Sequence, residues 1–411
     1  MKSHMKKSLY ALFPFIGLVA VLIIFFLLIL SFKGSGQAFK FINFGNLKSM
    51  VAATIIVGIG AMGMTIIIIS GGIDLSVGSQ LALGSVALAV FMVSQTNYYV
   101  TEKGSEDKYL LQNVVENQDS QKLATLADRL RLSKNARIDE VYAVLKTKRR
   151  DIPKLLQYAD FNAPNGKSVE WSKVKEEIST MTVMWSVLVA VAVCALCGLL
   201  NGAISVGFGI VPFIVTLGMM QIARGFAKML SGQSTVGTAD NVLKTFTDVD
   251  PKPAALLVSQ GVWIMIIVTV LLAIVLKYTV FGRYVYAIGS NENTAKLCGI
   301  NVTKVRILIY TIGGALTGIA SVMQYANVGS GIPNEAVGKE LDIIAAVVIG
   351  GGSLNGGEGS AIGSLAGALV MSVLRSGCTY LEVPDYVQNI IVGSIIILAV
   401  GIDKLKHRKA S

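Results

Sequence analysis

The sequence predicts an all-α membrane protein with about ten transmembrane helices, some of them broken, and three observations support this fold class. Apolar runs of about 20 residues, the length of a membrane-spanning helix, recur along most of the 411-residue chain. Hydrophobic residues make up 53% of the chain and charged residues only 15%, whereas a soluble domain carries about 25% charged residues. The alternating segments of about 10 residues that build an outer-membrane barrel are absent from the sequence.

Three spanning helices are predicted before residue 97. The first apolar run, Leu9–Leu30, is longer than the core of a signal peptide, and no small-residue cleavage pattern follows it. We therefore expect it to remain as a helix whose N-terminus lies inside. Leu47–Ser70 and Val77–Gln95 are the second and third spans, and the polar, glycine-containing stretch Gly71–Asp74 between them predicts a break.

Residues 97–180 differ from the rest of the chain and predict a separate soluble insertion. This segment contains 15 lysines and arginines and 13 aspartates and glutamates, so it is highly charged but nearly neutral. Apolar residues recur in it at helical spacing, which predicts a small helical domain, and the span count places it on the extracytoplasmic side. The chain then divides into residues 1–96, 97–180 and 181–411. The insertion is either a docking surface for an external partner or a solvated addition without a binding role.

Seven further spans are predicted after the insertion. A glycine-rich run, Gly350–Gly359, separates the eighth span from the ninth and predicts a second broken helix. The net charge of +11 gathers in part beside the first and last spans, which fits the positive-inside rule better than nucleic-acid binding and places both termini in the cytoplasm. The seven spans are Met181–Ile204, Val211–Leu230, Leu256–Lys277, Val305–Ala326, Leu341–Gly350, Ala361–Gly377 and Val383–Ile402.

A polar loop, residues 279–303, lies between the sixth and seventh spans on the cytoplasmic side. Gly282 and Gly289 are expected to allow tight turns. Between them and the seventh span, the sequence NENTAKLCG predicts one short helix, capped by Asn291 and ended by Gly299. A short helix held under the membrane by two spans is suited to transmit a push from another protein.

Three stretches resemble one protein family in the same order along the chain. They are GGIDLSVGSQLALGSV from Gly71, GRYVYAIGSNENTAKLCGIN from Gly282, and ELDIIAAVVIGGGSLNGGEGSAIGSLAGAL from Glu340. The chain thereby resembles the ribose/galactoside-type permeases of bacterial ABC sugar importers over nearly all its length except the insertion. Permeases for nucleosides and for branched-chain amino acids are near neighbours of that group.

The resemblance implies a membrane-spanning subunit that carries a ribose-, galactose- or xylose-type monosaccharide across the inner (plasma) membrane. It implies a partner ABC ATPase that binds ATP-Mg, a periplasmic or lipid-anchored sugar-binding protein, and a second permease chain that forms a homodimer with this one. Membrane lipid surrounds such a protein, and no nucleic acid is expected. The short helix in residues 279–303 is then the part that contacts the ATPase, through Gly282, Arg283, Ala287, Gly289, Asn291, Glu292, Ala295 and Gly299.

The residues of a sugar path are only weakly marked in the sequence. Polar side chains inside apolar helices either line a path or bond neighbouring helices to each other. Asp74 is open to the same two interpretations, because it precedes the third span and could cap that helix. The candidates are Asp74, Asn201, Gln221, Gln324, Asn327, Gln388 and Asn389.

Several functional classes lack sequence support. No P-loop motif is present, so ATP hydrolysis would need another subunit, and no cofactor is expected on this chain. Cys194 and Cys197 lie in an apolar run and read as packing residues, and the two histidines lie in the terminal tails, so neither a metal site nor a catalytic site is predicted. An ion-coupled carrier would need an ionisable site near midmembrane, where only Asp74 and Arg375 come close and neither has an obvious partner.

Overall fold

The computed structural model divides the chain into two compact units, which are described separately. The first comprises Met1–Phe91, Ser186–Gly237 and Asn241–Ser411, and the second comprises Met92–Trp185 with Thr238–Asp240. The structure describes residues 2–102, 108–130, 132–133, 136–147, 152, 155–156, 159, 161–164, 171–237, 241–251 and 257–408.

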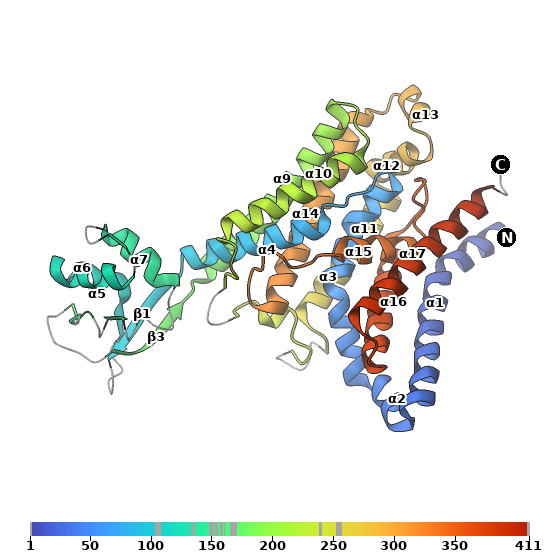
Figure 1. The fold of residues 1–411 in the computed structure, drawn as a ribbon. Coiled ribbons are helices and arrows are strands. Elements are labelled where there is room, and N and C mark those ends of the chain that lie inside the picture. The colour runs from blue at the N-terminus through green and yellow to red at the C-terminus, as the bar shows by residue number, and fades with distance from the viewer. Residues whose placement is uncertain are drawn as a thin grey trace. The chain divides into compact units, whose positions relative to one another are not determined.

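The first unit is a bundle of helices (Figure 1). Each of the ten predicted spans is helical, but among the described residues only eight helices are long and apolar enough to cross a membrane. These eight are α1 (Lys2–Lys33), α3 (Phe44–Ile69), α4 (Val77–Ser94), α9 (Thr180–Gly207), α10 (Pro212–Leu230), α11 (Gln260–Tyr278), α14 (Val302–Val328) and α16 (Ala361–Tyr380). The remaining helices of this unit are α2 (Ser35–Phe41), α12 (Val280–Ser290), α13 (Glu292–Leu297), α15 (Lys339–Ile349), α17 (Asp385–Arg408) and a single 3-10 turn, Lys244–Phe246.

Eight of the predicted spans meet this criterion among the described residues, the other two fall in α15 and α17, and the count of about ten crossings stays a prediction. Helix α15 has 11 residues because the chain turns at Gly350 and Gly351, and Gly351 adopts a positive φ of 91°. Helix α17 runs from Asp385 to Arg408; its described apolar stretch is Asp385–Leu398, and the sequence continues with the apolar residues Val400 and Ile402. Eleven helical residues rise only about 16 Å, roughly half the hydrocarbon thickness of a bilayer.

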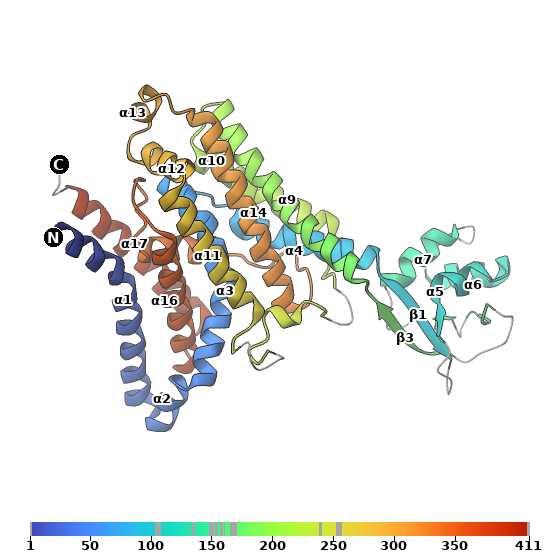
Figure 2. The same ribbon diagram turned by 180° about the vertical axis from the view of Figure 1, so that it is seen from behind.

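Helix α3 lies at the centre of the first unit, where it packs against α11, α14, α15 and α16 (Figures 1 and 2). Its last turn, Ile66–Ile69, is buried on every side. Close packing there depends on glycine, because a Cβ atom on Gly63 would lie 2.8 Å from the carbonyl oxygen of Gly313 in α14. Small residues of this kind let helix backbones approach each other inside a membrane.

The chain leaves the helical conformation at both predicted breaks. Helix α3 ends at Ile69, Gly71 takes a positive φ of 80°, and α4 begins only at Val77. The second break separates α15 from α16, which begins where the Ser360 side chain accepts a hydrogen bond from the Gly363 N–H group at 3.0 Å.

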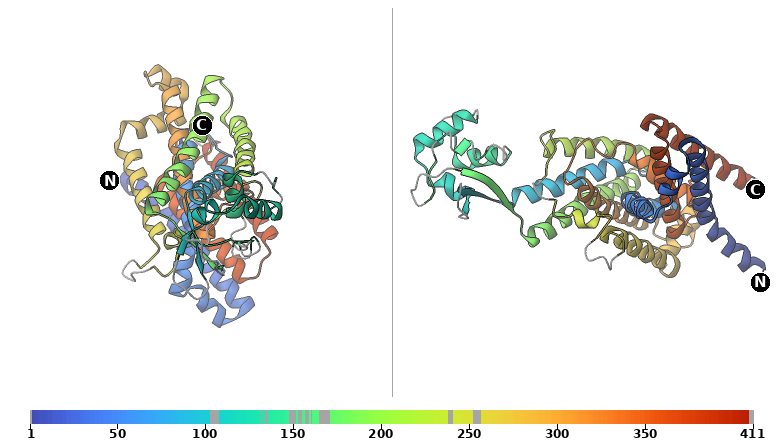
Figure 3. Two further views of the ribbon diagram at one scale, coloured as in Figure 1. Left: turned by 90° about the vertical axis from the view of Figure 1, so that its left-hand side faces the viewer. Right: turned by 90° about the horizontal axis from the view of Figure 1, so that it is seen from below.

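The second unit combines helices with a three-stranded antiparallel sheet, which corrects the expectation of a purely helical insertion. Strands β1 (Asn97–Glu102), β2 (Lys108–Leu110) and β3 (Trp171–Glu177) pair in the order β2-β1-β3. Figure 3 gives two further views of the ribbon. Residues Tyr98–Thr101 in β1 are aromatic or β-branched, and such residues favour strands. The helical spacing noted in the sequence corresponds to α6 (Ser120–Arg129) and α7 (Ile138–Thr147), and α5 (Leu111–Glu116) follows β2.

Candidate functional site

The short helix predicted at the centre of residues 279–303 is α13, and both of its predicted ends are confirmed. The Asn291 side chain accepts a hydrogen bond from the Thr294 N–H group at 2.9 Å, and Gly299 follows the helix with a positive φ of 81°. The Leu297 side chain is 88% exposed, and Cys298 next to it is also exposed. Helix α13 therefore presents an apolar and uncharged tip to its surroundings.

The residues before α13 were expected to turn at Gly282 and Gly289, and this prediction is wrong. Both glycines lie inside helix α12, which begins where the Thr279 hydroxyl accepts a hydrogen bond from the Gly282 N–H group at 3.1 Å. The Thr279 cap, worth about 1 kcal/mol, offsets part of the cost of two helical glycines, about 0.5–1 kcal/mol each, and the burial of Val285 and Ile288 also stabilises α12. Two consecutive helices, α12 and α13, thus occupy residues 280–297.

Ion pairs hold α13 against the start of α14. The Glu292 carboxylate lies 2.8 Å from the Lys296 ammonium group and 2.6 Å from the Arg306 guanidinium group. The hydrogen bond from Lys296 and the charge of Arg306 lower the pKa of Glu292, against an opposing effect of burial. Arg283 and Asn291 are exposed, and Ala295 is buried. Helix α13 is therefore tied to α14, while its tip stays free to contact another protein.

Helix α12 meets both helix breaks in a contact made almost entirely of backbone, here called the glycine junction. It consists of Ile69 and Gly71 at the end of α3, Gly289 in α12, and Gly356 and Gly357 in the second break. The Gly357 N–H group donates a hydrogen bond to the Ile69 carbonyl oxygen at 2.8 Å. A Cβ atom on Gly289 would overlap that same carbonyl oxygen and would lie 2.6 Å from the Gly357 nitrogen.

Two further contacts strengthen the glycine junction. A Cβ atom on Gly356 would lie 2.7 Å from the Gly289 carbonyl oxygen and 3.0 Å from the Gly71 Cα atom. The Tyr286 hydroxyl, one turn earlier in α12, donates a hydrogen bond to the Gly359 carbonyl oxygen at 2.8 Å. With no side chain between these backbones, a displacement of α12 must move the ends of α3 and α15, because close-packed interiors transmit strain. Ala287, also in α12, packs against the buried hydrophobic core that includes Ile69.

Two of the predicted path residues, Asp74 and Asn201, come together in a buried polar cluster at the first break. The Asp74 carboxylate accepts hydrogen bonds from the Ser76 N–H group at 2.8 Å and from the Gln80 amide at 3.3 Å. The Asn201 amide, which comes from α9, lies 3.4 Å from the same carboxylate and 3.0 Å from the Ser76 hydroxyl. The cluster therefore joins the break to a helix about 125 residues further along the sequence.

The other five predicted path residues lie in different places. The Gln324 amide donates a hydrogen bond at 2.5 Å to the half-buried Glu335 carboxylate, which lies in the segment that follows α14. Gln388 is buried but bonds the Val383 carbonyl oxygen at the start of its own helix. The remaining three, Gln221, Asn327 and Asn389, are exposed. Apart from the Asp74–Asn201 pair, the structure does not gather the predicted residues into one site.

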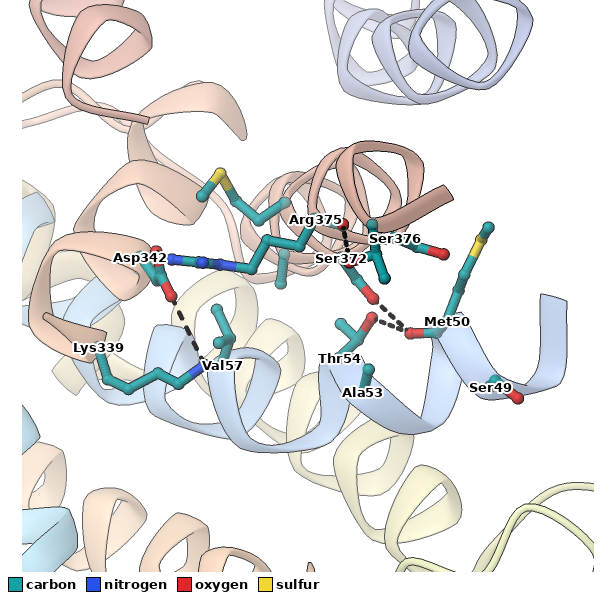
Figure 4. Close-up of a pocket in the computed structure, with 13 residues that line it drawn as sticks. Ser49, Met50, Ala53, Thr54, Val57, Lys339, Asp342, Ser372, Arg375 and Ser376 are labelled. Atoms are coloured by element: carbon teal, nitrogen blue, oxygen red, sulfur yellow. Dashed lines mark hydrogen bonds and ion pairs between the residues drawn. The ribbon is translucent and has the colours of Figure 1, made fainter. Parts of the chain in front are cut away.

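A cavity of about 330 Å³ lies between α3, α15 and α16 (Figure 4). The Arg375 guanidinium reaches from α16 to the Asp342 carboxylate on α15 at 2.7 Å, and the Lys339 ammonium lies 3.6 Å from the other oxygen of that carboxylate. The expectation that Arg375 has no obvious partner is therefore wrong. An arginine late in one span and an aspartate at the start of the preceding helix are a usable sequence signal, because intramembrane charges pair across adjacent helices.

Comparison with known proteins places most of the chain in one group. The model of a family described as "Branched-chain amino acid transport system / permease component" matches residues 46–400. The ribose import permease protein RbsC of Escherichia coli is 38% identical over 222 residues, which cover 54% of this chain and 69% of that protein.

Two further relatives are also sugar import permeases of similar identity to this chain. The galactose/methyl galactoside import permease protein MglC of Escherichia coli is 34% identical over 241 residues, or 58% of this chain and 72% of that protein. The fructose import permease protein FrcC of Rhizobium meliloti is 36% identical over 231 residues, or 55% and 64%. No solved structure matches the chain.

Proposed function

The chain belongs to the family of branched-chain amino acid transport system permease components, and on this premise we propose that it is the membrane-spanning subunit of a monosaccharide ABC importer. The observation that carries the choice of cargo is the set of relatives, whose names assign them to ribose, galactose and fructose import at 34–38% identity. Nucleosides and branched-chain amino acids are the alternative cargoes, the latter because the family description names them.

The proposed assembly contains two permease chains, a separate ATPase that binds ATP-Mg, and an extracytoplasmic sugar-binding protein. Both termini and helices α12 and α13 lie on the cytoplasmic side of the inner membrane. ATP closes the ATPase subunits, which push the exposed tip of α13. Helix α12 passes this motion through the glycine junction to α3, α15 and α16, and the bundles rearrange around the sugar path.

Uptake by reconstituted protein tests this proposal directly. Vesicles that contain the permease, its ATPase and its binding protein should accumulate ribose, galactose or fructose only when ATP is supplied. Vesicles that contain the permease alone should take up none of them, because the chain contains no P-loop of its own. Uptake by the permease alone, driven by an ion gradient, would instead identify a secondary carrier. ATP-driven uptake of leucine or a nucleoside, without uptake of any of the sugars, would show that the cargo is not a monosaccharide.

Cys298 provides a test of the orientation of α13. Cys298 is exposed whereas Cys194, Cys197 and Cys378 are buried, so a membrane-impermeant maleimide should label one cysteine per chain. We expect labelling in inside-out vesicles but not in right-side-out vesicles, and slower labelling once the ATPase is bound. The Cys298→Ser variant is the control and should remain unlabelled. Labelling from the external side would contradict both the topology and the role of α13.

A further inference from the structure

We infer that the cavity between α3, α15 and α16 is a binding subsite for a neutral polyhydroxylated ligand, a sugar on its way through the permease. The inference rests on the proposed function, because it assigns a place to the cargo. The cavity lies along the first half of α3, from Ser49 to Val57, whereas the glycine junction lies at the other end of this helix, at Ile69. With α13 on the cytoplasmic side, the cavity belongs to the external half of the bundle.

The size of the cavity suits one small ligand. Its volume of about 330 Å³ is at the lower end of the range of about 300–1,000 Å³ that small-molecule pockets occupy. The lining alternates between polar groups and the apolar side chains of Met50, Val57, Ala368 and Met371. A sugar ring presents hydroxyls at its edge and C–H groups on its faces. Its hydroxyls can therefore form hydrogen bonds with the polar groups of the lining, and its C–H groups can pack against the apolar side chains.

The charges in the cavity are arranged to face a polar occupant. The Asp342 side chain is only 3% exposed, whereas Arg375 and Lys339 beside it are 34% and 33% exposed. The Arg375 Nε atom is buried and has no hydrogen-bond partner among the described residues. An unpaired buried donor costs about 1–3 kcal/mol, and charges inside a membrane bundle mark paths and ligand sites. A ligand oxygen in the cavity would remove this cost after a shift of the guanidinium that brings the buried Nε atom to the cavity surface.

Two hydroxyl groups in the cavity wall can accept hydrogen bonds from a ligand. The Thr54 and Ser372 hydroxyls both donate to the Met50 carbonyl oxygen, at 2.8 and 2.6 Å, so their oxygens remain acceptors (Figure 4). A ligand hydroxyl can accept from Arg375 or Lys339 and donate to one of these oxygens or to Asp342. An anion could be bound only by Arg375 and Lys339, because the Asp342 carboxylate has no proton to donate and the Thr54 and Ser372 hydroxyls already donate theirs to the Met50 carbonyl oxygen.

Cysteine protection tests the occupant of the cavity. In a Cys298→Ser background, Ser376→Cys places a thiol in the cavity wall, and Ser234→Cys in the exposed loop after α10 is the control. Ribose, galactose or fructose should slow the reaction of a charged methanethiosulfonate with the cavity thiol about threefold at twice its dissociation constant, and leave the control rate unchanged. Protection by inorganic phosphate instead of all three sugars, or by none of these compounds, overturns the inference.

Charge variants separate binding from structure. Arg375→Gln and Asp342→Asn should each lower sugar uptake about tenfold at limiting sugar, the equivalent of about 1.4 kcal/mol of lost binding. The exchange of both charges, Asp342→Arg with Arg375→Asp, restores an ion pair and should recover the melting temperature but not uptake. Recovery of uptake by the exchange would show that the pair is only structural. If the unaltered importer moves no sugar at all, the proposed function fails, whereas normal uptake with unaffected variants rejects only the subsite.

Discussion

Alanine at Gly289 is expected to abolish coupled transport. The added methyl group would overlap the Ile69 carbonyl oxygen and lie 2.6 Å from the Gly357 nitrogen. Both obstacles are backbone atoms, so the overlap can be relieved only by moving whole segments apart. Overpacking of this kind costs about 1–3 kcal/mol in the folded state, and we expect a value at the upper end for Gly289→Ala. Uptake into vesicles and thermal unfolding in detergent measure the two effects.

The control for Gly289→Ala is Gly218→Ala in α10. No described atom lies within 4 Å of the position of its Cβ atom, and alanine favours a helix over glycine by up to about 1 kcal/mol. This control should therefore retain uptake and unfold at the same temperature or a higher one. A Gly289→Ala protein that binds the ATPase but no longer links ATP hydrolysis to uptake would identify the glycine junction as the transmitting contact. Normal uptake by this variant would refute that role.

The second large effect is expected at Asp74. Asp74→Ala removes the acceptor shared by the Ser76 N–H group and the amides of Gln80 and Asn201. These donors are buried at the first break, and a buried donor without a partner costs about 1–3 kcal/mol. We expect a total loss of about 2–4 kcal/mol in the free energy of unfolding. Asp74→Asn keeps one oxygen acceptor and should lose less.

Denaturant or thermal unfolding of the purified permease measures the effect of Asp74→Ala. The control is Asp250→Ala, because Asp250 is 91% exposed and lies 3.5 Å from Lys48 in a surface pair. Surface pairs contribute little to stability, so this control should unfold like the unaltered protein. An Asp74→Ala protein that is equally stable would show that the cluster does not hold the break, and would favour a role for Asp74 in the sugar path alone.

Local signals in the sequence were enough to predict α13 and the two helix breaks. An asparagine cap and a terminal glycine act within a few residues, so Asn291 and Gly299 could be placed without knowledge of the rest of the fold. The prediction of turns at Gly282 and Gly289 was wrong, because a glycine in the sequence can indicate either a turn or a position where two backbones come into close contact. Only the neighbouring segments, at Ile69 and Gly357, decide between these uses.

Long-range features could not be predicted in the same way. The pair of Asp342 and Arg375 spans 33 positions in sequence, and its existence depends on which helices are neighbours. The polar path candidates were chosen by residue type, which does not say on which side of a helix each one lies, so Gln221 and Asn389 are exposed. In the insertion, two helical patterns were recognised. Strand β1 carries a local strand signal in its aromatic and β-branched residues, whereas the mostly charged β3 becomes recognisable only through its pairing with β1.

Because the glycine junction is made of backbone, the choice of ATPase partner and the transmission of motion inside the bundle can evolve independently. Apart from the Tyr286 hydroxyl, the groups that join α12 to the helix breaks are peptide atoms, and substitutions outside the glycine junction leave them in place. The tip of α13, by contrast, consists of exposed side chains such as Leu297. A lineage could therefore exchange one motor subunit for another by altering that tip alone, and inherit the internal linkage unchanged.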